Sequence, residues 1–179
     1  MPDNKQIVCG IDPGLRITGY GVLCADDDED TISIMDAGII RCSHEETLAL
    51  RLAELATSLD EILDEHRVDV LAVEEIYSHY RKPRTAILMA HARGVILLGA
   101  AQHNIEVLHL PSTTVKKHLT GHGRANKEQM QRAVASTLSL SQIPEPPDVA
   151  DALAIAICAA CVLRQPAKLA MNNDDLLIK

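Results

Sequence analysis

Aromatic side chains are almost missing from this sequence. Its 179 residues include three Tyr and neither Phe nor Trp. The hydrophobic core must therefore be built mainly from Ala, Val, Ile and Leu. The hydrophobic share of 47% excludes disorder over most of the chain. The length favours one α/β or α+β domain with room for a real core.

Paired cysteines and long apolar runs are also lacking. The five Cys are an odd number, and the closest pair, Cys158 and Cys161, lies in an apolar helical run without a second pair or a nearby His. We interpret both as core thiols rather than zinc or redox cysteines. Unpaired cysteines fit a reducing compartment. Because no stretch approaches the roughly 18 apolar residues of a membrane span and no apolar signal segment is present, we expect a cytoplasmic protein with no membrane contact.

Positive charge is in deficit, with 17 Lys and Arg against 25 Asp and Glu, a formal net charge of −8. Taken alone, this total argues against a nucleic-acid partner. The deficit is uneven, however: residues 76–135 hold nine Lys and Arg and two acids, a net charge of +7, whereas the rest of the chain carries −15. The total therefore averages over a basic stretch that is suited to a DNA-facing surface.

Hydrophobic periodicity predicts one domain over residues 1–164, followed by a polar tail over 165–179. The acidic connector at 26–30 is predicted to be a solvated hairpin tip. Three consecutive strands, followed by alternating helices and strands, predict an α/β fold with a five-stranded mixed sheet flanked by helices. The expected strands are 6–12, 17–24, 31–40, 69–74 and 105–110, and the expected helices are 46–65, 85–103, 113–119, 127–139 and 148–163.

Four carboxylates stand at the ends of apolar elements. Asp12 and Glu74 each end a strand, and Asp148 and Asp151 open the last helix, three residues apart on one face. If the two strands are neighbours, these side chains converge on one crevice. Such a cluster repels itself unless cations neutralise it, and Mg²⁺ prefers carboxylate ligands. Two such ions about 3.5–4 Å apart can activate a water and stabilise the leaving oxygen of a phosphodiester.

Each acid also has a simpler interpretation when taken alone. Asp12 could organise the Asp-Pro-Gly turn that follows its strand, and Asp148 could be only a helix N-cap. Glu75, next to Glu74, should point to the opposite face of the sheet, toward solvent. Only the joint pattern favours a metal site over these alternatives.

Four segments resemble the RuvC family of Holliday-junction resolvases, and the likeness runs in order from about residue 6 to residue 163. The resemblance implies a ribonuclease-H-like fold, a homodimer, and Mg²⁺-dependent paired nicks across four-way DNA junctions in recombination and repair. Mn²⁺ is the expected substitute metal, and the branch-migration proteins RuvA and RuvB are the expected partners. The segments are GIDPGLRITGYGVL (10–23), LAVEEIY (71–77), HARGVIL (91–97) and DVADALAIAI (148–157).

Carried over by motif, the resemblance assigns the catalytic residues. Asp12, Glu74 and Asp148 are the expected ligands of two Mg²⁺ ions per subunit. Asp151 is the fourth catalytic carboxylate, as a further ligand or as an orienter of the attacking water.

The resemblance also implies where DNA is held. Tyr77 matches an aromatic that stacks on a base at the opened junction, worth roughly 1–3 kcal/mol, although a half-buried packing role fits equally. The Gly-rich loop 121–127 leads into a helix N-terminus and could hold phosphate. Helix 85–103 is the expected dimer contact, or simply a core helix. The expected DNA contacts are Tyr77, Lys116, Lys117, Arg124 and Lys127.

Two other functions compete with a resolvase. The GIDPG turn is also similar to the first phosphate loop of actin-like ATPases and sugar kinases, but the further nucleotide-binding segments of those proteins are not visible in 179 residues. A catalytically silent junction-binding module would be expected to lose acids from the cluster, and all four are present. We therefore expect a crossover junction endodeoxyribonuclease.

Overall fold

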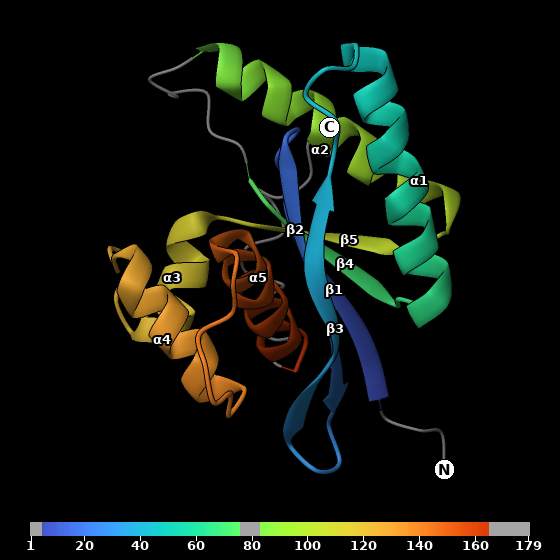
Figure 1. Cartoon of the computed structure of the whole chain (residues 1–179). Coiled ribbons are helices and arrows are strands. Elements are labelled where there is room, and N and C mark those ends of the chain that lie inside the picture. The colour runs from blue at the N-terminus through green and yellow to red at the C-terminus, as the bar shows by residue number, and fades with distance from the viewer. Residues whose placement is uncertain (1–4, 76–82, 165–179) are drawn as a thin grey trace.

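One mixed sheet organises the computed structural model, which describes residues 5–75 and 83–164 (Figure 1). The strand order is β3-β2-β1-β4-β5. β1, β2 and β3 pair antiparallel, while β4 runs parallel to β1 and β5 runs parallel to β4. This confirms the predicted five-stranded mixed sheet. The strands are β1 (Lys5–Asp12), β2 (Ile17–Asp26), β3 (Thr31–Arg41), β4 (Val70–Glu74) and β5 (Glu106–Leu110).

All five predicted helices are also present, with ends that differ from the prediction by at most two residues. α1 begins at Leu48 rather than residue 46 because the Thr47 side chain caps it, accepting a hydrogen bond from the Leu50 amide. The helices are α1 (Leu48–His66), α2 (Pro83–Gln102), α3 (Ser112–Thr120), α4 (Lys127–Thr137) and α5 (Pro147–Leu163).

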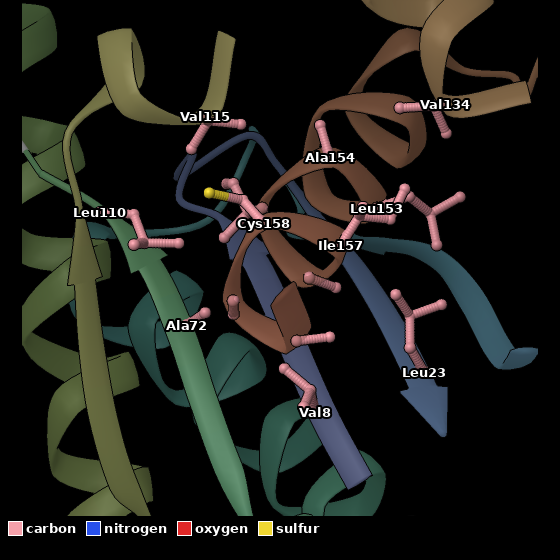
Figure 2. Packing of buried hydrophobic residues seen from close by; sticks show 14 of the residues in the cluster. Val8, Leu23, Ala72, Leu110, Val115, Val134, Leu153, Ala154, Ile157 and Cys158 are labelled. Atoms are coloured by element: carbon pink, nitrogen blue, oxygen red, sulfur yellow. The ribbon is translucent and has the colours of Figure 1, made fainter. Parts of the chain in front are cut away.

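Helices cover both faces of the sheet. α5, with α3 and α4 beside it, covers one face, and α1 and α2 cover the other (Figure 1). Figure 2 shows the core on the α5 side, where Leu153, Ile157 and Cys158 of α5 gather with Val8, Leu23 and Ala72 of the strands. Because side chains alternate along a strand, even-numbered residues of β1 and β4 face α5 and odd-numbered residues face α1 and α2.

Glycines let α5 approach the sheet closely. A side chain at Gly10 would collide with the backbone of Ala152 and Ala156, and one at Gly19 would collide with the backbone of Asp148. Gly19 is also the partner of Asp12 in the β1–β2 ladder. This contact therefore sets the first turn of α5 beside the end of β1.

The acidic hairpin tip between β2 and β3 is exposed, but it is also bound. Arg164, just after α5, donates from Nε to Asp27 Oδ1 at 2.9 Å and from Nη1 to Asp30 Oδ1 at 2.8 Å. Its Nη2 also donates to the main-chain oxygens of Asp26 and Thr31. The tip thus fastens the far end of α5 to the sheet.

The cysteines behave as predicted. All five are free, and Cys158 is buried in the α5 core. Burial raises the pKa of Cys158 to about 12, which suppresses the reactive thiolate. Cys158 and Cys161 are therefore packing residues.

Helix α2 departs from one expectation. Over Arg84–Gln102 it is long and apolar enough to cross a membrane by length and composition, with a mean hydropathy of 1.3, so the prediction that no stretch approaches such a run was wrong. The helix nevertheless packs on the domain, since Ala92, Ile96 and Ala100 are fully buried. Its exposed apolar residues, Ile87 and Leu98, lie on a different surface of the helix.

Candidate active site

Asp12 and Glu74 lie side by side at the ends of two parallel strands. The β1–β4 register pairs Ile11 with Val73, so each strand contributes its next residue to the same edge. Both acids are even-numbered, like the residues of these strands that face α5, and both line one cavity of about 270 Å³. β1 and β4 are therefore neighbours, which is the condition under which Asp12 and Glu74 were expected to converge.

Asp148 and Asp151 belong to the first turns of α5. The N-cap of this helix is Pro146 and Pro147 follows it, so the interpretation of Asp148 as the N-cap was wrong. Asp151 lines the cavity that contains Asp12 and Glu74. Asp148 and Asp12 instead line a second hollow of about 430 Å³. Asp12 thus stands between two depressions, with one α5 acid on each side.

The four carboxylates act on one another electrostatically. The pKa of Asp12 is raised to about 7, first by burial and then by the negative charges of Asp151, Glu74 and Asp148. Burial also raises the pKa of Glu74 and of Asp151, and each of these acids has another member of the cluster adding to the rise. A buried acid surrounded by acids holds its proton more tightly. The cluster inferred from sequence is therefore one electrostatic unit.

Two of the predicted DNA contacts lie in the same cavity. Lys127 Nζ is 3.6 Å from Asp151 Oδ2, and its charge opposes the rise in the pKa of Asp151. Lys116 opposes the rise in the pKa of Glu74. Both lysines line the 270 Å³ cavity. They supply positive charge beside the acids, where a phosphate could lie.

Two other predicted DNA contacts do not line the cavity. Lys117 and Arg124 are exposed and are absent from the described lining of both hollows. Tyr77, and residues 76–82 in general, lie outside the described residues. In the Gly-rich loop, Asn126 caps α4 by accepting from the Gln129 amide at 2.9 Å. Because the Gln129 amide already donates to the Asn126 side chain, the Lys127 side chain is the better candidate for holding phosphate.

The donor set fits hard divalent cations by its chemistry, because it consists of carboxylate oxygens that repel one another. Across residues 5–75 and 83–164, however, no three His, Cys, Asp or Glu side chains are arranged so that they could hold a metal ion. Mutual repulsion opposes such close gathering until the acids share a cation. Metal binding would therefore require these side chains to draw together.

Sequence reasoning missed several residues around the site. Ser112, the first residue of α3, lines the cavity just past the end of β5. The rule that sites form at the carboxyl ends of parallel strands could have found it. Arg16 and Arg51 line the second hollow, where Arg51 Nη2 donates to the Leu15 carbonyl at 2.9 Å. Nothing in the helical pattern around Arg51 distinguished it from a surface residue.

Comparison with known proteins decides the family. The family model described as crossover junction endodeoxyribonuclease RuvC matches residues 8–159. The chain belongs to the RuvC family. A RuvC from Rhodopirellula baltica is 46% identical over 165 residues, which is 92% of each chain.

Solved RuvC structures confirm the ribonuclease-H-like resolvase fold. Thermus thermophilus RuvC matches with a TM-score of 0.82 and 31% identity, covering 90% of this chain and 97% of that one. The same RuvC in complex with Holliday junction substrate matches with a TM-score of 0.83 and 31% identity, covering 90% of this chain and 96% of that one. The RuvC motifs read from the sequence thus lie on a RuvC fold.

Proposed function

We propose that this member of the RuvC family is a cation-dependent endonuclease that resolves Holliday junctions by paired symmetric nicks. The observation that carries the proposal is the convergence of four mutually repelling carboxylates beside two lysines at one edge of the sheet. Such a site suits hydrolysis of a phosphodiester, whose attacking and leaving oxygens both need charge stabilisation. RuvC family enzymes are generally metal-dependent nucleases.

Asp12, Glu74 and Asp148 would hold two Mg²⁺ ions, with Mn²⁺ as a substitute. When bound, the ions would supply an activated water and neutralise charge on the leaving 3′-oxygen. Asp151 would orient the attacking water, or would serve as a further ligand if Lys127 moved from it to a phosphate oxygen. Lys116, on the Glu74 side of the cavity, holds a second phosphate oxygen and limits repulsion between the acids and the DNA.

The DNA would pass over Asp12 from one depression to the other. Lys116 and Lys127 lie on the α3–α4 side, and Arg16 and Arg51 lie on the other. Lys117 and Arg124 would extend the basic surface on the first side. Tyr77, three residues beyond Glu74, remains the proposed stacking residue at the junction centre.

Helix α2 supports a homodimer. Its solvent side carries small and apolar residues at helical spacing around a shallow depression of about 480 Å³, and both Ile87 and Leu98 are 57% exposed. Two copies that meet here would bury an apolar stripe and pair two active sites, which paired nicks require. The lining residues are Ile87, Ala90, His91, Gly94, Val95 and Leu98. RuvA and RuvB are the proposed partners, and the cytoplasm is the proposed location.

Neither competing function gains support. Gly10 of the GIDPG turn is closed off by the backbone of α5, so this glycine serves helix packing rather than phosphate binding. A silent binding module has no need for four clustered acids, three of which raise the pKa of Asp12, since such acids oppose the binding of phosphates.

The test offers the purified protein a synthetic four-way junction and a linear duplex of the same sequence, each with and without Mg²⁺. We expect paired nicks on the junction alone, and only with Mg²⁺. Equal nicking of both substrates would indicate a general nuclease. Junction binding with no nicking at any Mg²⁺ or Mn²⁺ concentration would indicate a silent module.

A further inference from the structure

Arg93 of α2 lies behind the active site and spans the ends of two strands. Its Nη2 is 2.6 Å from Nδ1 of His109 on β5, and its Nε donates to the main-chain carbonyl of Glu74 on β4 at 3.4 Å. Next to these contacts, the Glu75 amide donates to the Leu110 carbonyl at 3.0 Å. One guanidinium therefore bridges the two strand ends at the level where Glu74 enters the cavity.

The bridge lies on the opposite face of the sheet from the acids. Glu74 and Ala72 are alternate residues of β4 and face one side of the sheet, where Ala72 packs with the α5 core. His109 and Val107 are alternate residues of β5 and face the other side, where Val107 packs with the α1–α2 core. Glu75 was expected to be solvent-exposed on this second face. It is instead half-buried, and its charge acts on both Arg93 and His109.

The chemistry of Arg93 and His109 determines which of the two groups donates the hydrogen bond. Guanidinium groups carry donors only, so Nδ1 of His109 must accept and the ring proton resides on Nε2. Burial, with the nearby Arg93 charge, lowers the pKa of His109, which keeps the ring neutral and able to accept. Arg93 is thus anchored on β5 while its Nε reaches the backbone of β4.

We propose that Arg93 is a positioning residue, which holds the main chain of Glu74 from behind the sheet so that the Glu74 carboxylate is presented to the cation site. Glu74 is the last residue of β4, and the main chain at the end of a strand can change its orientation unless further contacts hold it. The same contact ties the site to α2, the helix proposed to form the dimer. The inference rests on the proposed cation-dependent function, because its effect is exerted on a proposed ligand.

The experiment measures Mn²⁺ binding to the full-length protein alone, by calorimetry, together with junction nicking and junction binding in EDTA. The variants are Arg93→Gln, Arg93→Lys and His109→Leu. The control is His103→Gln, which removes a surface histidine that lies 3.2 Å from Asp64 and does not touch a strand end. Arg93→Lys is included in case Arg93→Gln misfolds. Lysine keeps the positive charge but reaches only one of the two acceptors, the Glu74 carbonyl and His109 Nδ1.

We expect Arg93→Gln to weaken Mn²⁺ binding and to lower kcat, each by roughly 10-fold, as outer-shell substitutions at metal sites do. KM and the junction Kd in EDTA should stay within about 2-fold, and excess Mn²⁺ should restore part of the nicking. Arg93→Lys and His109→Leu should show smaller shifts in the same direction, and His103→Gln none.

Wild-type Mn²⁺ affinity in Arg93→Lys and His109→Leu would overturn the proposal. So would an Arg93→Gln variant that loses thermal stability and junction binding together while its Mn²⁺ affinity is unchanged. If the wild type binds Mn²⁺ and does not nick junctions, the proposed function fails. The Mn²⁺ affinities of the variants then still decide the role of Arg93.

Discussion

Gly19 lies directly against the main-chain carbonyl of Asp148, and no side chain fits between them. A methyl group on Gly19 would lie 2.7 Å from the Asp148 carbonyl carbon, well inside contact distance. Because Gly19 is paired with Asp12 in the β1–β2 ladder, this contact determines how close Asp148 comes to Asp12. The spacing of two proposed catalytic acids thus depends on a residue with no side chain.

Gly19→Ala should therefore displace the first turn of α5 and reduce junction nicking by at least about 10-fold, since small misplacements of catalytic groups are costly. The matched control is Gly21→Ala on the same strand, whose methyl would first meet the flexible Leu153 side chain at 2.7 Å. It should lose stability and keep more activity. Nicking rates and thermal melting of both variants check this, and equal activity in the two would contradict it.

Nicking should depend on pH through the carboxylate cluster. The pKa of Asp12 is about 7, so this acid still holds a proton at pH values where an ordinary Asp has lost it. Cations compete with that proton, so activity at limiting Mg²⁺ should fall as the pH drops below about 7, by roughly tenfold per pH unit for one proton.

Raising the Mg²⁺ concentration should move the midpoint of this pH profile to lower pH, because more cation displaces the proton. Initial nicking rates on one junction, measured across this pH range at two Mg²⁺ concentrations, test the expectation. A midpoint that does not move with Mg²⁺ would show that the titrating group is not a cation ligand.

Lys127→Ala should separate catalysis from stability. The Lys127 and Asp151 side chains are 59% and 38% exposed, and exposed ion pairs contribute only about 0–1 kcal/mol to folding. Melting should therefore change little, whereas nicking should fall by at least about 10-fold, because a cation beside the scissile phosphate is lost. Lys117→Ala removes an exposed lysine of the proposed basic surface that does not line the cavity, and it should lower nicking less. Equal nicking by both variants would remove Lys127 from the site.

Leu98→Glu should break the proposed dimer by placing a charge on the apolar stripe of α2. We expect sedimentation to show monomers, and paired nicks to become single, uncoupled nicks. The control is Leu50→Glu on α1, where the leucine is 51% exposed and does not line the depression on α2. A Leu98→Glu protein that sediments like the wild type would move the dimer contact to another surface.

The sequence predicted most of the fold and the acids, but not their supports. Strand and helix periodicity located every element, and the strand-end positions of Asp12 and Glu74 indicated their convergence. Arg93 could not be found this way, because its role depends on a contact through the sheet between α2 and two strand ends. The alternative that Asp148 is only a helix N-cap fails for a local reason, because Pro146 is the N-cap of α5 and Pro147 is its first residue. Tyr77 stays a prediction.

The proposed activity depends on four carboxylates acting together as one cation-dependent catalytic site. Its most direct test is cleavage of a synthetic four-way junction in Mg²⁺ by Asp12→Asn and Asp148→Asn. Asp60→Asn serves as the control, since its side chain lies on α1, away from the cavity.

Junction binding in EDTA is measured for the same proteins. We expect both site variants to lose nicking and to keep junction affinity within a few-fold, while the control and the wild type cut only with Mg²⁺. Cleavage at the wild-type rate by either Asp12→Asn or Asp148→Asn would contradict it.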